Sequence, residues 1–412
     1  MSTDEAVGTD LRTLAERVWT PGSPLDWPVT VSFGRPPSDA TVVEQYVVVP
    51  DLSRPKFLVP VGAQVASRAA FTRYLTTSSA KTRGLGYLSA AGFGTPVGGR
   101  VFGGRVFVGI DPSIPQTQWS DWLLLDHLRD VLGGDRLVAY LPVRRAVPNA
   151  KPTLRLFQRD GQPRGYVKVG WSLATRAVVR NEATALREVE GRVGGLLTPA
   201  LAADGQWQGQ EYAVAAPLPP RVRAWTQEPS STPELLTGIA RSGKTSRTPL
   251  SASSYAARVR ADLERAAKQE PDISAALLRW LDRLEAKPGQ LDYGRWHGDY
   301  VPGNLGRTHD GPVAWDWEYS DPDVPVGFDL LHWHFQDRLS PDDGNLVDAS
   351  QAVDAESHRL SRLGVEPGSH RLVASLYLLE MFTRSVRMAA AGAGWNRKYE
   401  SGLVEIANRR DR

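Results

Sequence analysis

The sequence predicts an α+β fold in which a strand-rich part of the chain precedes a mainly helical part. Between residues 135 and 218, short apolar runs alternate with turn residues, as is typical of antiparallel strands. After residue 219, apolar residues recur at the spacing of amphipathic helices. The first 134 residues mix both patterns, which favours an additional α+β domain. We therefore expect three domains, at residues 1–134, 135–218 and 219–412.

The composition excludes several classes of chemistry. The chain has 412 residues and no cysteine, so it has no thiol nucleophile, disulfide or Cys-ligated metal centre. Its 49 basic and 46 acidic residues give a net charge of only +3, and the arginines are scattered. Proteins that bind nucleic acid concentrate basic residues on one stripe, so we expect no nucleic-acid partner.

Targeting and membrane signals are weak. The first ten residues are polar and acidic, without the basic and apolar regions of a signal peptide. The most apolar helix candidate, residues 372–388, contains Glu380, Arg384 and Arg387 and is too short to span a bilayer. Together with the missing cysteines, this predicts a cytoplasmic protein with no membrane partner.

The first two parts of the chain supply the expected strands. In the first part we predict helices at 11–19, 66–75 and 121–132, and strands at 42–49, 57–61 and 101–110. In the second part we predict strands at 137–143, 153–157, 165–169 and 211–218, with a helix at 174–190. A polar loop, residues 144–151, separates the first two of these later strands.

The third part is predicted to be helical around one irregular segment. Tyr255, Val259 and Leu263 recur at i, i+4 and i+8, and a second helix follows with the same kind of repeat. Further helices are expected at 233–241, 348–363, 371–391 and 398–409. Residues 295–329 lie between them and are non-helical in pattern and rich in acids and histidine.

The irregular segment carries residues suited to phosphoryl transfer. Asp299 and Asn304 are separated by four residues, and a hairpin with its turn at 308–311 would bring Asp316 close to Asn304. In such chemistry one Asp accepts a hydroxyl proton, while an Asn and a second Asp hold Mg²⁺ across the phosphates of ATP. The alternative is an ordinary surface loop, because turns favour Asp and Gly. That alternative does not explain His297-Gly298-Asp299 between apolar and aromatic neighbours.

The same segment resembles a known family. Residues 297–305, HGDYVPGNL, resemble the H-G-D-x-x-x-x-N signature of aminoglycoside phosphotransferases and choline kinases, and residues 315–319 and 327–330 resemble the blocks that follow it. The resemblance covers about residues 137–390. It implies a protein-kinase-like fold with a mainly β N-lobe and a mainly α C-lobe. It also implies Asp299 as catalytic base, Asn304 and Asp316 as magnesium ligands, His297 as support for the loop, and a structural Asp329.

A kinase of this kind needs a phosphate-binding lysine on a strand and a glutamate on the next helix. The chain has eight lysines, and Lys168 is the one embedded in an apolar strand-like run. On the following helix, Glu182 falls on the apolar stripe formed by Val179, Leu186 and Val189. A buried carboxylate needs a partner, so we predict a Lys168–Glu182 pair. The alternative is a Glu182 at the edge of the stripe, in solvent.

The remaining nucleotide contacts are less distinct. No glycine-rich phosphate loop is present, and its place is taken by residues 144–151. We expect Asn149 and Lys151 near the phosphates, although this stretch also fits a solvated turn. Adenine should meet backbone groups near Ala216 and Leu218.

Two other patterns suggest chemistry that we do not expect. Residues 238–245 satisfy G-x-x-x-x-G-K-[ST], but a phosphate-binding loop follows a strand, and these residues follow an expected helix. His332 and His334 are two residues apart and cannot share one helix face, so we expect them to pack or hydrogen-bond beside Asp329 rather than hold a metal.

The acidic segment also bears on the substrate. Residues 316–329 contain five acids and no Lys or Arg, which would favour a polar or cationic acceptor, although some acids could instead cap a helix. Trp317 and Glu318 are candidate acceptor contacts, the indole by stacking. The prediction is an ATP- and Mg²⁺-dependent kinase that phosphorylates a hydroxyl of a sugar, amino sugar or aminoglycoside-like molecule. Alternatives are a choline or amino-alcohol kinase, or a pseudokinase that binds nucleotide without turnover.

The first 134 residues carry no motif. They can cap the nucleotide-binding part, mediate a homodimer or shape access of the acceptor, and the sequence does not choose among these roles.

Overall fold

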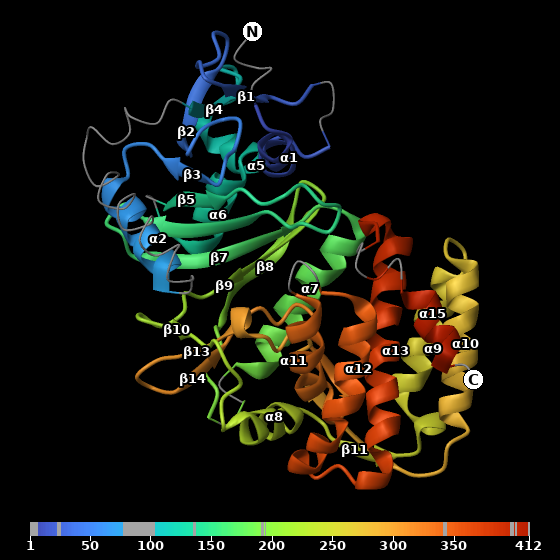
Figure 1. The fold of residues 1–412 in the computed structure, drawn as a ribbon. Helices are drawn as coiled ribbons and strands as arrows, with labels where there is room; N and C mark the ends of the chain where they lie inside the picture. The colour runs from blue at the N-terminus through green and yellow to red at the C-terminus, as the bar shows by residue number, and fades with distance from the viewer. Residues whose placement is uncertain are drawn as a thin grey trace. The chain divides into compact units, whose positions relative to one another are not determined.

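A computed structural model describes residues 7–22, 26–76, 104–134, 137–190, 193, 195–340, 344–395, 399 and 402–410. The chain divides into two compact units, residues 1–183 with 199–223, and residues 184–198 with 224–412. The first unit is built on a large sheet and the second is mainly helical, which confirms the predicted α+β class (Figure 1). The expected strand 101–110 and helix 398–409 begin outside the described residues. Residues 1–6 of the N-terminal segment also lie outside them.

A nine-stranded sheet organises the first unit, with strand order β1-β4-β2-β3-β5-β6-β7-β9-β8. All its pairings are antiparallel. Its strands are β1 (Val29–Phe33), β2 (Thr41–Val49), β3 (Phe57–Pro60), β4 (Gly104–Ile110), β5 (Leu137–Pro142), β6 (Thr153–Gln158), β7 (Pro163–Gly170), β8 (Leu201–Trp207) and β9 (Gln210–Ala215).

The sheet runs through the domain boundary that the sequence suggested at residue 134. β3 pairs with β5, with Phe57 opposite Pro142 and Leu58 opposite Leu141. Five of the six residues of β5 are buried, so this strand needs neighbours on both edges and on both faces. The predicted separate domain at 1–134 is therefore corrected: these residues and the following strands form one sheet in one compact unit.

Helices cover both faces of this sheet. On one face, α1 (Thr9–Val18) and α6 (Leu124–Leu132) bury apolar residues at helical spacing against residues such as Val48 and Leu156. On the other face, the N-terminal part of α2 (Gln64–Thr76) packs small residues against Val47, Val49 and Phe157. Short helices η1 (Gln116–Gln118) and α5 (Trp119–Trp122) precede α6. Adjacent residues of β2 thus enter different cores, as the alternation of a strand requires.

Helix α7 (Leu173–Val189) follows β7, and its first part belongs to the sheet unit. Val179 and Ala183 pack against Ala213 of β9. The helix begins after Trp171, where the Thr175 hydroxyl accepts hydrogen bonds from the backbone N–H groups of Trp171 and Ser172.

The helical unit is arranged around α13 (His370–Met388), most of whose residues are buried. α13 packs against helices on several sides, as Figure 1 shows. The other helices are α8 (Thr232–Ala240), α9 (Ser254–Ala266), α10 (Pro271–Glu285), α11 (Phe328–Leu339), α12 (Leu346–Glu356) and α15 (Leu403–Arg410), with short 3₁₀ turns η2 (Leu250–Ala252), η4 (Ser357–Leu363) and η5 (Pro367–Ser369) and the π-helical turn η6 (Ala389–Ala393). No helix among the described residues is long and apolar enough to cross a membrane.

Two small strand groups complete this unit and frame the irregular segment. β11 (Ser246–Thr248), β12 (Leu291–Trp296) and β15 (Asp321–Pro325) form one antiparallel sheet. After the 3₁₀ turn η3 (Pro302–Asn304), β13 (Leu305–Arg307) and β14 (Pro312–Ala314) form the predicted hairpin. β10 (Arg223–Ala224) lies at the boundary between the units. Residues 241–245 connect α8 to β11, so the G-x-x-x-x-G-K-[ST] match neither follows a strand nor opens a helix, as predicted.

Candidate functional site

The segment between β12 and η3 is a tight loop whose backbone is hydrogen-bonded to the side chain of Asp329. In the first turn of α11, the Asp329 carboxylate accepts hydrogen bonds from the backbone N–H groups of His297 (2.6 Å) and Gly298 (3.0 Å). Burial raises the pKa of Asp329 to about 7, while the two N–H donors favour its ionised form. The structure thus places Asp329 where it fixes the backbone immediately before Asp299.

His297 joins this loop to the segment that carries Asp316. Its Nδ1 accepts the backbone N–H of Asp299 (3.2 Å), so its Nε2 carries the proton and donates to the carbonyl of Trp315 (3.1 Å). The ring is fully buried, 4.4 Å from the ring centroid of Trp317. The two hydrogen bonds fix both the tautomer and the ring orientation.

The Asp299 carboxylate is held through both of its oxygens. Oδ2 accepts from the side-chain Nδ2 of Asn304 (2.7 Å), and Oδ1 lies 3.2 Å from Nε2 of His332. The Asp299 side chain nevertheless remains 30% exposed, so a substrate can reach it. Burial alone would raise the pKa of Asp299, but the hydrogen bond from His332 and the nearby His297 and Arg384 outweigh it and hold the pKa below its ordinary value.

Asn304 and Asp316 are suited to a divalent cation. Asn304 directs its Nδ2 to both the side chain and the carbonyl of Asp299, which leaves its oxygen as the atom for a metal. The backbone N–H of Trp315 donates to the carbonyl of Asn304 (3.0 Å), so the residue before Asp316 is tied to Asn304 as predicted. Asp316 has a positive φ of 70°, a conformation that costs energy for a residue with a Cβ. An amide oxygen and a half-buried carboxylate fit the hard-oxygen preference of Mg²⁺.

Arg384 on α13 is a further part of this loop that the sequence did not reveal. Its guanidinium donates to the carbonyl of Gly298 (2.9 Å) and lies 4.5 Å from the ring centroid of Tyr319 and 4.9 Å from that of Trp296. Stacking between two aromatic rings is a geometry that arginine favours over lysine. The sequence signal was an arginine within a mostly apolar helix, but nothing in the sequence indicates its partner.

The expectation of a strongly acidic acceptor surface is only partly met. Asp321 pairs with Arg258 (3.1 Å), Asp323 accepts a hydrogen bond from the hydroxyl of Ser254, and Asp329 accepts hydrogen bonds from the loop backbone, so at least these three acids are engaged internally. Trp317 is fully buried and packs on His297, which contradicts its predicted stacking on an acceptor. Glu318 is also buried, at 8% exposure, and its acceptor role stays a prediction.

The predicted lysine–glutamate pair is present in the sheet unit. Lys168 Nζ lies 2.9 Å from Glu182 Oε2, and the two side chains are 16% and 5% exposed. Lys168 is on β7, opposite Thr153 of β6 and Ala213 of β9, so neighbours flank it on both sides. The strand-to-helix contact is thus confirmed, while its role with a nucleotide stays a prediction.

The other predicted nucleotide contacts are less well placed. Asn149 is exposed and Lys151 half-buried in the loop between β5 and β6. The backbone N–H of Ala216 already donates to the carbonyl of Ala200 (2.7 Å), and Pro217 has no N–H. Ala216 can therefore offer adenine only its carbonyl, and Leu218 carries the next backbone N–H after Ala216.

A polar cavity of about 530 Å³ lies between α11 and α12. Its lining carries more acidic than basic side chains and comprises His334, Asp337, Arg338, Gly344, Asp348, Gln351, Ala352, Ala355 and Glu356. His334 accepts a hydrogen bond from Arg359 (2.7 Å), whereas His332, two residues earlier on α11, reaches Asp299. The two histidines therefore have separate partners, and His332 contacts Asp299 rather than lying only beside Asp329.

No protein-family model matches the chain, and no curated protein matches its sequence. Among solved structures, a candidate fructosamine-3-kinase from Haemophilus somnus is 13% identical with a TM-score of 0.44, over 71% of this chain and 97% of that one. A thermostable mutant of aminoglycoside phosphotransferase APH(4)-Ia is 12% identical with a TM-score of 0.43, over 69% and 98%. Amicoumacin kinase hAmiN is 11% identical with a TM-score of 0.42, over 72% and 95%. The function proposed below therefore rests on the chain's own residues.

Proposed function

We propose that the protein is an ATP- and Mg²⁺-dependent kinase that phosphorylates a hydroxyl of a small molecule. The observation that carries the proposal is the Asp299 carboxylate, fixed through both oxygens yet 30% exposed, beside an Asn304 whose amide oxygen is left for a cation. Phosphoryl transfer requires mainly positioning and charge stabilisation, and this loop supplies an aligned acceptor of a proton.

In the proposed reaction Asp299 orients the acceptor hydroxyl and takes its proton. Because the pKa of Asp299 is held low, the group is ionised at neutral pH and aligns the hydroxyl without deprotonating it beforehand. As the bond from the hydroxyl oxygen to the γ-phosphorus forms, the bond from that phosphorus to the β-phosphate oxygen breaks, and the hydroxyl proton passes to Asp299. The products are a phosphate ester and ADP.

Asn304 and Asp316 would hold Mg²⁺, which supplies charge neutralisation for the phosphates when bound. The proposal assigns Lys168, oriented by Glu182, to a phosphate of the same nucleotide. A buried Glu182 keeps the ammonium group in one position, because the long lysine side chain otherwise samples many rotamers. Asn149, Lys151 and Leu218 remain weaker nucleotide candidates.

For the acceptor we favour a sugar, amino sugar or aminoglycoside-like molecule. The support for this class is the sequence of residues 316–329, which contains five acids and no Lys or Arg and so suits a polar or cationic acceptor. The cavity between α11 and α12 is lined by no residue of the Asp299 loop, and we do not assign it to the acceptor. A choline or amino-alcohol kinase is the alternative within enzymes, although the burial of Trp317 removes the aromatic face that favoured it. We also propose a cytoplasmic location, where ATP is available as phosphoryl donor. The homodimer stays a prediction from the sequence.

An ATP-consumption screen with Mg²⁺ over sugars, amino sugars, aminoglycosides and choline tests the proposal. Turnover with one acceptor class is expected, and the Asp299→Asn variant should lower kcat by about 10³-fold or more while ATP binding is retained. Asp310→Asn, the same change at an exposed turn residue of the β13–β14 hairpin, is the matched control and should leave kcat unchanged. Binding of ATP–Mg²⁺ without turnover on any acceptor would instead favour the pseudokinase.

A further inference from the structure

The loop between β5 and β6 is tied to helix α1, which lies far from it in sequence. The backbone N–H of Ala146 donates to Oδ1 of Asp10 (2.7 Å) across 136 residues. The guanidinium of Arg17 donates to the carbonyl of Ala150 (3.0 Å) across 133 residues. One end of α1 thus holds the first half of the loop, and the other end holds the second half.

Trp171, between β7 and α7, completes the attachment. Its indole N–H donates to the same Ala150 carbonyl (2.9 Å), so this oxygen accepts two hydrogen bonds. The Arg17 guanidinium stacks on the indole ring at 3.8 Å from its centroid. Gln210 of β9 donates from its side chain to the backbone carbonyl of Arg17 (2.8 Å), which fixes α1 to the sheet. Arg17, Trp171 and Ala150 therefore form a closed three-way contact.

The loop has few internal hydrogen bonds that would hold it in one conformation. Residues 143–152 contain no glycine, and their internal backbone hydrogen bonds are those of short turns, from Val147 to Arg145 and from Ala150 to Val147. Ala150 lies between Asn149 and Lys151, the two residues of this loop predicted to meet phosphates. The contacts that fix the backbone of Ala150 therefore also restrict the positions of both neighbours. A loop that is already ordered loses less conformational entropy when a ligand binds.

We propose that α1 is a built-in clamp for this loop and that Asp10 and Arg17 are positioning residues for nucleotide phosphate binding. The nucleotide part of this inference rests on the proposed kinase function. It gives the N-terminal residues a role that the sequence left open: they pre-order a phosphate-binding loop that lacks glycine. Neither residue touches the reacting atoms, so both act through the backbone of Ala146 and Ala150.

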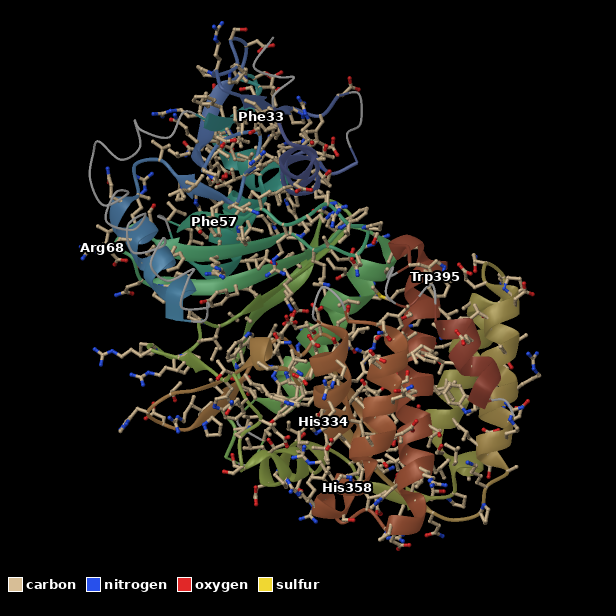
Figure 2. All side chains as sticks on the ribbon, viewed as in Figure 1. Phe33, Phe57, Arg68, His334, His358 and Trp395 are labelled. Carbon is tan, nitrogen blue, oxygen red and sulfur yellow. The ribbon has the colours of Figure 1, made fainter. Side chains whose placement is uncertain are left out.

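The test compares Arg17→Ala with Arg12→Ala in the full chain. Arg12 lies on the same helix, with its guanidinium 5.6 Å from the ring centroid of Phe33, a side chain labelled in Figure 2, and serves as the matched control. In Arg17→Ala, hydrogen exchange of the amides in 144–151 should be about 10-fold faster, and the KM for ATP about 5- to 10-fold higher, with the acceptor KM unchanged. Arg12→Ala should change neither quantity.

Conservative variants at the same positions separate loss of one hydrogen bond or stack from general misfolding. Asp10→Asn keeps an oxygen that accepts from Ala146 and should behave as wild type, whereas Asp10→Ala should speed exchange at Ala146. Arg17→Lys keeps the charge but loses the planar stack on Trp171, so an intermediate KM for ATP is expected.

Unchanged exchange in both Arg17→Ala and Asp10→Ala would refute the clamp. Faster exchange with an unchanged KM for ATP would refute its role in nucleotide binding. If the wild-type protein binds no ATP, the proposed function and the nucleotide role fail together, while the exchange measurements still decide whether α1 orders the loop.

Discussion

His332 donates a hydrogen bond from Nε2 to Oδ1 of Asp299, over 3.2 Å, and it does so from α11, which begins at Phe328, after the segment that carries Asp299. An ionised carboxylate only accepts, so the imidazole N–H is the donor, and Nδ1 of the neutral ring accepts the hydroxyl proton of Tyr377 (2.9 Å). Burial lowers the pKa of His332, which favours this neutral form. A buried chain from Tyr377 through His332 therefore orients the proposed base.

Replacement of His332 should weaken catalysis and change its pH dependence. In His332→Phe the ring volume is kept but the donor is lost, so kcat should fall about 10- to 100-fold, as for other residues that orient a catalytic group. Without the donor, the pKa of Asp299 rises from about 2, because burial is then opposed by fewer favourable contacts. The acid limb of kcat/KM, measured from about pH 4 to about pH 8, should move to higher pH.

Tyr377→Phe is the graded control for this prediction. It removes only the hydrogen bond to Nδ1 and should give a smaller loss of kcat with little shift of the acid limb. An identical pH profile in wild type and His332→Phe would show that His332 is only a packing residue.

Replacing only Lys168 of the Lys168–Glu182 pair should lower the free energy of unfolding more than replacing both residues. In Lys168→Met the Glu182 carboxylate, 5% exposed, loses its ion-pair partner, and the free energy of unfolding should fall by about 3 kcal/mol. The double variant Lys168→Met/Glu182→Leu should recover most of that loss, because the buried charge of Glu182 is then removed as well. Both variants lack the lysine proposed to bind a phosphate, so both should have a higher KM for ATP and a lower kcat than wild type. Denaturant unfolding and steady-state kinetics on both variants would separate the two roles, and equal stability losses would contradict this reasoning.

Gly298 should not tolerate a side chain, although Gly303 in the same loop should. Gly298 has a φ of +83°, and a Cβ there would lie 2.0 Å from the backbone oxygen of Tyr319. Gly298→Ala should therefore lower the free energy of unfolding by about 3–5 kcal/mol and abolish activity. At Gly303 a Cβ meets nothing within 4 Å, so Gly303→Ala should be near neutral. Thermal unfolding of the two alanine variants tests this prediction. Similar melting temperatures for both variants would contradict it.

Glu44 should make the stability of the sheet unit depend on pH. Burial raises its pKa to about 7 from an ordinary value of 4.5, despite hydrogen bonds from Tyr46 and Trp19. Between these two values the folded protein holds a proton that the unfolded chain releases, so the contribution of Glu44 is full below about pH 4.5 and is lost as pH rises through about 7. Glu44→Gln removes this dependence.

The relevant quantity is the difference in unfolding free energy between Glu44→Gln and wild type. It should grow by about 2–3 kcal/mol from pH 4.5 to pH 7, in favour of the variant. Other carboxyl groups titrate in both proteins and cancel in the difference. Denaturant unfolding at each pH, followed by the intrinsic fluorescence of the 13 tryptophans, gives both free energies. A difference that stays constant over this range would show that Glu44 is ionised in the folded state.

Much of the loop could be predicted because its chemistry is local in sequence. The spacing of Asp299 and Asn304, and the turn at 308–311, lie within one short segment, and the hairpin formed as expected. The Lys168–Glu182 contact was also predictable, since an apolar strand and an apolar helix stripe each contained one charge.

The parts that escaped prediction depend on distant elements. His332 and Arg384 reach the loop from α11 and α13, and their own sequence neighbourhood shows only histidine and arginine in apolar helices. β8 lacks β-branched residues and contains Gly205, where a Cβ would lie 2.8 Å from the Tyr212 hydroxyl, so pairing with β9 rather than propensity makes it a strand. Trp317 differs for another reason: the sequence favours an acceptor contact for this aromatic side chain, but the ring is buried against His297.

The pairing of β3 with β5 has a consequence for any attempt to work with a shortened chain. Deletion of the N-terminal strands would leave β5, with five buried residues out of six, as an uncapped edge with free N–H and C=O groups. Such edges recruit other strands, so the truncated protein should self-associate and precipitate rather than yield a smaller soluble protein.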